Sequence, residues 1–232
     1  MISYILTDIE GTTTDILFVH KVLFPYSYQK LPDFVKSHLQ DDQVAACIRE
    51  TQQSLLDEKG LHADLALCIE TLLDWIRDDR KHPALKRLQG MIWRKGYAEG
   101  AFKGHLYPDV APQLQRWRAR NIGIGIYSSG SVEAQRLLFG YSEYGDLTHL
   151  FDHFFDTAVG HKKESQSYQH IAAVLDIAPG NILFLSDVEA ELDAARAADM
   201  HTLQLVRAGG IPSLKHPVAV DFSEAERMIH SF

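Results

Sequence analysis

The sequence has few cysteines and no long apolar run. Its two cysteines, Cys47 and Cys68, lack the spacing of a metal site and are too few for a disulfide framework. We expect both to be buried free thiols in a reducing compartment. No apolar stretch approaches the roughly 20 residues of a membrane-spanning helix, and Met1 leads straight into an apolar strand without a signal peptide. These absences predict a cytoplasmic protein that has no membrane partner.

Basic residues are also too few for a surface that binds nucleic acid. The 232 residues include 23 Lys and Arg against 31 Asp and Glu, which gives a formal net charge of −8. A negative chain repels the phosphate backbone of DNA or RNA, so we expect no nucleic-acid partner. A small anionic substrate is still compatible with this charge, because a lysine or a metal ion can reverse the sign inside a pocket.

Two kinds of pattern alternate along the chain. Between residues 16 and 102, apolar residues recur three and four positions apart, which predicts helices and no strand. From His105 onward, short apolar runs alternate with amphipathic helices that begin near Ser131, Glu164 and Val188. This alternation is typical of βαβ units around a mostly parallel sheet. The strands are expected at Ile2–Leu6, Ile122–Tyr127, Phe154–Phe155, Ile182–Leu185 and Thr202–Val206.

The helical stretch interrupts the α/β pattern directly after its first strand. We therefore predict two domains. One is an α/β core formed by residues 1–15 together with residues 104–232, and the other is a helical domain at residues 16–103.

The first strand ends abruptly in polar residues. Asp8 and Glu10 follow the apolar run of Met1–Thr14, one residue apart and directly before Gly11. Open α/β sheets bind ligands at the carboxyl ends of their strands, where a carboxylate can be a nucleophile, a metal ligand or both. Taken alone, the segment is equally compatible with an acidic junction between a strand and a loop.

Small hydroxyl residues follow a second predicted strand. Ser128, Ser129 and Ser131 come directly before a helix that begins near Val132. Free backbone N–H groups and the helix dipole make such a helix N-terminus a binding site for phosphate. An N-cap role explains Ser131 on its own, with Glu133 in the first turn, but it does not explain Ser128 and Ser129. We therefore predict that these two serines bind phosphate.

A lysine and a second acidic group occupy two later junctions. Lys162 lies directly before a predicted helix, where its ammonium can stabilise a carboxylate and a phosphoryl oxygen, although an isolated lysine is more often a surface residue. Asp187 ends another apolar strand, and Glu191 follows it one helical turn later. Two strand ends that deliver acidic oxygens form a site for a hard divalent cation such as Mg²⁺. An acidic first helical turn is the alternative, and it suits Glu189 better than Asp187.

Taken together, these four motifs resemble the haloacid dehalogenase (HAD) superfamily of phosphotransferases. The strings DIEGTTTDI, LFPYS, YSSGSVEAQRLLFG and GHKKESQSY are more specifically similar to the enolase-phosphatase E1 family of methionine salvage. The resemblance runs from near residue 4 to about Val206, and Glu10 stands where most superfamily phosphatases have aspartate. It implies a HAD-like, doubly wound, mostly parallel sheet with a helical cap inserted after the first strand.

The same resemblance implies the reaction and the roles of the residues. The substrate would be 2,3-diketo-5-methylthiopentyl-1-phosphate, which is enolised and then dephosphorylated to the acireductone 1,2-dihydroxy-3-keto-5-methylthiopentene. Asp8 would be the nucleophile that forms an aspartyl-phosphate, and Glu10 the general acid/base. Ser128, Ser129 and Lys162 would hold the phosphoryl oxygens, and Lys162 would also support catalysis.

The resemblance further implies one Mg²⁺ per subunit in a monomeric enzyme. Its ligands would be Asp8, Asp187 and an oxygen of Glu10, from either the side chain or the backbone, with Glu191 behind them.

Two other functions stay open at this point. One is a HAD phosphatase for another small phosphomonoester. The other is a receiver-like phospho-acceptor domain, which also combines Asp, Ser or Thr, and Lys at strand ends. Such a domain places its acidic pair first and its phospho-acceptor later, and it has no large helical insertion after its first strand.

Overall fold

The structure is a computed structural model that describes residues 1–232, except for the side chain of Ser231. Contacts between Cα atoms divide the chain into two units, which we describe separately. One unit comprises Met1–Ile16 together with Lys103–Phe232, and the other comprises Leu17–Phe102. The boundaries lie one residue away from those expected from the sequence.

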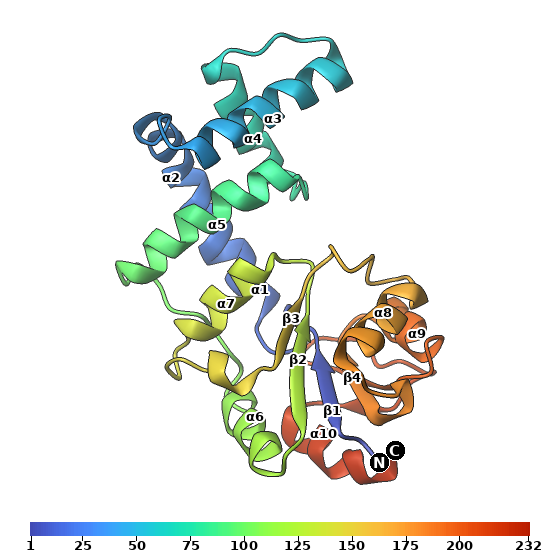
Figure 1. Ribbon diagram of the computed structural model, residues 1–232. Helices are drawn as coiled ribbons and strands as arrows, with labels where there is room; N and C mark the ends of the chain where they lie inside the picture. The colour runs from blue at the N-terminus through green and yellow to red at the C-terminus, as the bar shows by residue number, and fades with distance from the viewer. The chain divides into compact units, whose positions relative to one another are not determined.

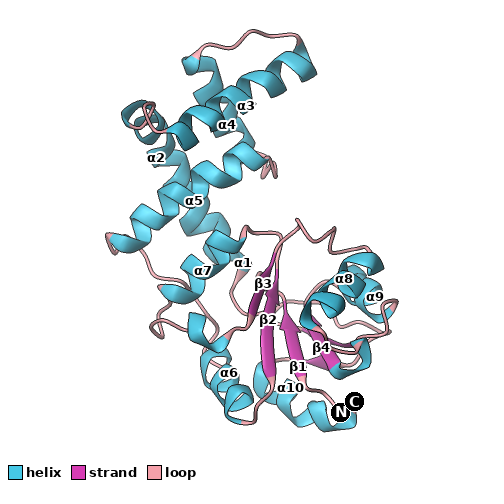
Figure 2. Cartoon of the chain, in the orientation of Figure 1, coloured by secondary structure: helices cyan, strands magenta, loops and turns pink.

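The first unit is built on a parallel sheet of six strands in the order β3-β2-β1-β4-β5-β6 (Figures 1 and 2). The predicted mostly parallel α/β architecture is therefore confirmed. The inner strands are apolar and fully buried, as expected where helices cover both faces of a sheet. The strands are β1 (Tyr4–Thr7), β2 (Gly123–Tyr127), β3 (His153–Phe155), β4 (Ile182–Ser186), β5 (His201–Leu205) and β6 (Val218–Ala219).

Five helices cover this sheet. Helices α6 and α10 contact each other, and so do α8 and α9, while α7 packs on β3 (Figure 1). Ser131, Glu164 and Val188 are the N-cap residues of α7, α8 and α9, in agreement with the helix starts expected from the sequence. The helices are α6 (Val110–Ala119), α7 (Val132–Gly140), α8 (Ser165–Leu175), α9 (Glu189–Arg196) and α10 (Phe222–Met228).

The register of the sheet aligns the predicted motifs. Thr7, the last residue of β1, pairs with Ile126 of β2 on one side and with Leu185 of β4 on the other. Because all these strands are parallel, the loops that follow them emerge at one edge of the sheet. Strand β1 lies between β2 and β4, which is where the order of the strands reverses and where ligands bind in open α/β folds.

The second unit is made of helices, with no strand among its described residues. Its buried core includes Cys47 and Cys68, which are free thiols as expected. No helix in the described part of either unit is long and apolar enough to cross a membrane. The helical segments are α1 (Ile16–Phe18), a π-helical turn (Val19–Leu23), α2 (Phe24–Ser37), α3 (Asp42–Lys59), α4 (Leu65–Arg77) and α5 (Pro83–Ala98).

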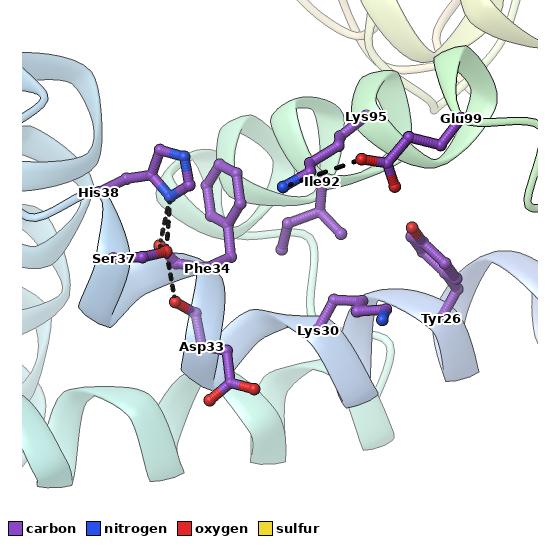
Figure 3. A pocket seen from close by; sticks show the side chains of 9 residues that line it. All are labelled: Tyr26, Lys30, Asp33, Phe34, Ser37, His38, Ile92, Lys95 and Glu99. Atoms are coloured by element: carbon purple, nitrogen blue, oxygen red, sulfur yellow. Dashed lines mark hydrogen bonds and ion pairs between the residues drawn. The ribbon is translucent and has the colours of Figure 1, made fainter.

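A groove of about 250 Å³ runs between α2 and α5 within this helical unit (Figure 3). Its side chains include Lys30 and Asp33 from one helix and Lys95 and Glu99 from the other. Lys95 and Glu99 approach to 4.0 Å, and His38 is hydrogen-bonded to the carbonyl oxygen of its own helix one turn earlier. Because charges of both signs alternate there, the groove has no excess of one sign to select a ligand.

Candidate active site

The loop after β1 is a tight turn that fixes the direction of two carboxylates. The backbone N–H of Asp8 donates to the carbonyl of Leu185 in β4 at 2.8 Å, which holds the end of β1 against its neighbour. The N–H groups of Thr12, Thr13 and Thr14 then all converge on the carbonyl of Ile9, at 2.8–3.2 Å. The chain therefore reverses within a few residues and leaves Asp8 and Glu10 at the carboxyl end of the sheet.

This turn contacts the loop after β4 directly. Gly11 has φ +74°, and a Cβ atom there would lie 2.3 Å from Oδ2 of Asp187. The hydroxyl of Thr12 accepts a hydrogen bond of 3.1 Å from the backbone N–H of Asp187. The two acidic loops are therefore in contact, and glycine is required at position 11 for steric and for conformational reasons.

A cavity of about 200 Å³ opens where these loops meet. All the residues predicted for the site line it except Ser128, and Ile16 and Val188 supply its apolar wall. Those predicted from the sequence are Asp8, Glu10, Ser129, Lys162, Asp187 and Glu191.

Lys162 is the central cation of the cavity. Its Nζ lies 2.5 Å from Oδ1 of Asp8 and 2.6 Å from Oε2 of Glu191, and the three side chains are nearly inaccessible to solvent. The hydroxyl of Tyr168 donates to the carbonyl of Lys162 at 2.7 Å and fixes its backbone. Burial lowers the pKa of Lys162, but attraction by Asp8 and Glu191 outweighs burial and raises the pKa above its usual value. Lys162 is therefore fully charged at neutral pH.

The carboxylates outnumber this single cation. Burial raises the pKa of Asp187 to about 6, and the nearby charge of Asp8 raises it further. The pKa of Glu191 is also raised, chiefly by burial and then by Asp8, although Glu191 contacts Lys162 and accepts a hydrogen bond from Ser186 at 3.0 Å. Additional positive charge at this position would relieve the repulsion.

The residues present fit a divalent cation. Oδ1 of Asp187 is buried and has no hydrogen-bond partner among the described residues, so it is available to a cation. No group of three or more Asp, Glu, His or Cys side chains in the described part of the chain is arranged to hold a metal ion by itself. Mg²⁺ does not require such a group, because it commonly binds one or two carboxylates and completes its shell with water and substrate phosphate.

The structure gives the two predicted phosphate-binding serines different surroundings. Ser129 lines the cavity, whereas Ser128 is buried and its hydroxyl accepts a hydrogen bond from the N–H of Gly130 at 3.2 Å. Gln135 of α7 supports the same loop by donating to the carbonyls of Gly130 and Phe155, at 2.9 and 2.8 Å. The sequence pattern did not indicate Gln135, because a buried glutamine within a helix resembles an ordinary polar helix residue.

Replacing Gly11 by alanine is expected to lower activity about 10–100-fold, the range typical when a residue that supports metal ligands is lost. The added Cβ would displace the Asp187 carboxylate, on top of about 1–2 kcal/mol of backbone strain. Gly145→Ala is the matched control, since Gly145 also has a positive φ of +85° but has nothing within 4 Å of its Cβ position. Steady-state kinetics should show loss of activity for Gly11→Ala alone; equal effects of both variants would attribute the loss to strain.

Comparison with known proteins agrees with this geometry. A family model described as haloacid dehalogenase-like hydrolase matches residues 2–199. An enolase-phosphatase E1 of Klebsiella pneumoniae is 52% identical over 224 residues, which are 97% of this chain and 96% of the relative. An enolase-phosphatase E1 of Marinobacter nauticus is 50% identical over 231 residues, which are 99% of each chain.

Solved structures show the same fold. The Unknown transcript 4 protein of Saccharomyces cerevisiae superposes with a TM-score of 0.79 at 34% identity and covers 95% of this chain, which in turn covers 98% of that protein. The L-2-haloacid dehalogenase of Xanthobacter autotrophicus has a TM-score of 0.60 over the full length of both chains. At 16% identity, this second similarity concerns the fold alone.

Proposed function

Because this chain belongs to the haloacid dehalogenase-like hydrolases and, within them, to the enolase-phosphatase E1 family, we propose that it converts 2,3-diketo-5-methylthiopentyl-1-phosphate to an acireductone. The product is 1,2-dihydroxy-3-keto-5-methylthiopentene, and the reaction is a step of methionine salvage. Membership of this family excludes the receiver-like domain that the motifs alone left open.

The observation that carries this proposal is the buried contact between Asp8 and Lys162 within a cavity of carboxylates. A nucleophilic carboxylate must be ionised, and an ammonium group 2.5 Å away favours the ionised form. In the proposed reaction, Asp8 attacks phosphorus, the enol oxygen leaves, and water then hydrolyses the aspartyl-phosphate. Lys162 lies where it can also neutralise a phosphoryl oxygen during both steps.

Ser129 and Ser128 are proposed to complete phosphate binding. Ser129 lines the cavity directly, and the loop that carries both serines leads into the N-terminus of α7. Ser128 acts through the loop, since its hydroxyl already accepts the N–H of Gly130.

The metal ion of this reaction is proposed to be a single Mg²⁺. Families of this kind generally use a divalent metal. Asp8, Asp187 and an oxygen of Glu10 would hold the ion, with Glu191 behind them. Mg²⁺ supplies positive charge that neutralises the phosphoryl group and polarises a ketone oxygen of the substrate. The unpartnered Oδ1 of Asp187 supports this assignment.

Glu10 is proposed to transfer the protons. Its carboxyl lines the cavity beside Asp8, and its side chain is one methylene longer than the aspartate usual at this position. The added length extends its reach toward the carbon acid of the diketone. We also propose that the helical unit acts as a cap that excludes water, and that the enzyme is a cytoplasmic monomer.

Replacing Glu10 by glutamine is expected to lower the rate of dephosphorylation by on the order of 10²–10⁴-fold, the usual contribution of general acid–base catalysis. Glutamine keeps nearly the same shape but cannot transfer a proton. Stopped-flow absorbance of the enol, recorded with phosphate release, tests whether enolisation falls as well. A variant that retains both rates would contradict the role assigned to Glu10.

A panel of phosphomonoesters tests the proposed substrate. We expect kcat/KM for the diketone phosphate to exceed that for common sugar and nucleoside phosphates, because only the diketone can be enolised before phosphate leaves. Equal kcat/KM values across the panel would assign the protein to the phosphatases that act on another small phosphomonoester.

A further inference from the structure

Arg207, just after β5, makes contacts that the proposed reaction does not use. Its Nε and Nη2 donate to the carbonyl oxygen of Thr12, at 3.1 and 2.7 Å. Its Nη1 donates to Oδ1 of Asp109 at 2.9 Å. Arg207 therefore joins the loop after β5, the N-terminus of α6 and the loop after β1, although 195 residues separate it from Thr12 in the sequence.

The guanidinium group is held from several sides. Its Cζ lies 4.2 Å from the ring centroid of Tyr107 and 5.6 Å from that of Phe222. The other oxygen of Asp109 accepts a hydrogen bond of 2.9 Å from the N–H of Phe222. Only 12% of the Arg207 side chain and 15% of the Asp109 side chain are exposed. A charge pair this restricted has one geometry, which is what a positioning role requires.

Thr12 transmits this geometry to the acidic loops. It is completely buried, its carbonyl accepts two bonds from Arg207, and its hydroxyl accepts the N–H of Asp187. Its neighbour Gly11 lies against the carboxylate of Asp187. A shift of the Thr12 peptide would therefore change the spacing between Asp187 and the loop that carries Asp8 and Glu10.

We propose that Arg207 is a positioning residue that fixes the two acidic loops relative to each other, acting through Thr12. The inference rests on the proposed function for its kinetic part only. Lysine cannot replace arginine here, because a single ammonium group cannot donate to the Thr12 carbonyl and to Asp109 in the same fixed plane.

A second arginine–aspartate pair provides a matched control. Nη1 of Arg118 lies 2.8 Å from Oδ2 of Asp152, and this oxygen also accepts a backbone N–H, that of Ile124. The chemistry is the same as at Arg207 and Asp109. Asp152, however, lies beside Gly123, at the amino end of β2 and away from the catalytic edge of the sheet.

The test compares Arg207→Lys with Arg118→Lys by kinetics, melting temperature and calorimetric titration with Mg²⁺ alone. We expect Arg207→Lys to lower kcat and weaken Mg²⁺ binding about 10–100-fold each, with KM changed less than about twofold. Arg118→Lys should leave all three quantities unchanged. Unaltered kcat and Mg²⁺ affinity in folded Arg207→Lys would overturn the proposal.

Thr12→Val keeps the inference testable if Arg207→Lys does not fold. Valine retains the shape and the carbonyl of Thr12 but removes the hydroxyl that holds Asp187, so the same loss of Mg²⁺ affinity is expected. In the double variant the two losses should not add, because both act on one chain of contacts; additive losses, or no loss in Thr12→Val, would contradict the proposal. If the wild-type protein binds Mg²⁺ but does not turn over the diketone phosphate, the proposed function fails, while the Mg²⁺ titrations still decide the role of Arg207.

Discussion

Replacement of Asp8 by asparagine is expected to reduce phosphate release by on the order of 10⁴-fold or more, the usual effect of removing a nucleophile. The amide has nearly the same shape but lacks the charge that attacks phosphorus. The fold should be retained, because the bond that holds this position to β4 comes from the backbone N–H of residue 8. Lys162 also keeps its second partner, Glu191, at 2.6 Å. Inorganic phosphate is measured with the purified variant, and a melting curve confirms folding.

Asp193→Asn is the matched control for this experiment. Asp193 lies on α9 in the same unit, and its partly exposed carboxylate pairs with Arg196 and Lys215 outside the cavity. We expect this variant to keep its activity. Undiminished phosphate release by Asp8→Asn would disprove the assignment of the nucleophile.

Replacement of Lys162 by methionine is expected to destabilise the protein by about 3–5 kcal/mol, the usual effect of removing one partner from a buried ion pair. Asp8 and Glu191 would be left close together without the cation that now contacts both. Activity should also be lost, since nothing else in the cavity would neutralise the phosphoryl oxygens in place of the ammonium group. Urea unfolding and phosphate release measure the two effects separately.

The neighbouring residue offers a close control. Lys163 is exposed, and Lys163→Met should change the free energy of unfolding by no more than about 0.5 kcal/mol, as is usual at surface positions. Equal unfolding midpoints for the two methionine variants would contradict the view that Lys162 holds a buried cluster of carboxylates together.

Much of the fold could be predicted because burial leaves a local record in each element. An apolar run that ends in a polar residue marks a parallel strand, and Asp8, Ser128 and Asp187 each follow such a run. Strand β6 was missed because Val218 and Ala219 are too few to form a pattern. The division into units was accessible for the same reason, since helical periodicity replaces strand patterns over a long continuous stretch.

The supporting contacts of the site could not be predicted in this way. The bonds of Arg207 to Thr12 and of Gln135 to Phe155 join loops whose proximity depends on the register of the sheet. No spacing along the chain encodes them. The different surroundings of Ser128 and Ser129 likewise depend on which hydroxyl the loop turns inward. The sequence therefore identified the chemical groups, and the structure was needed to show what holds them.

The central claim is that one cavity performs both enolisation and dephosphorylation. Its most direct test is to incubate the protein with Mg²⁺ and the diketone phosphate while enol absorbance and free phosphate are followed in the same sample. We expect the enol signal to rise with phosphate release in the wild-type protein, and both signals to be absent or strongly reduced in Glu10→Gln. Rapid phosphate release without any enol signal would contradict the claim and identify an ordinary phosphatase.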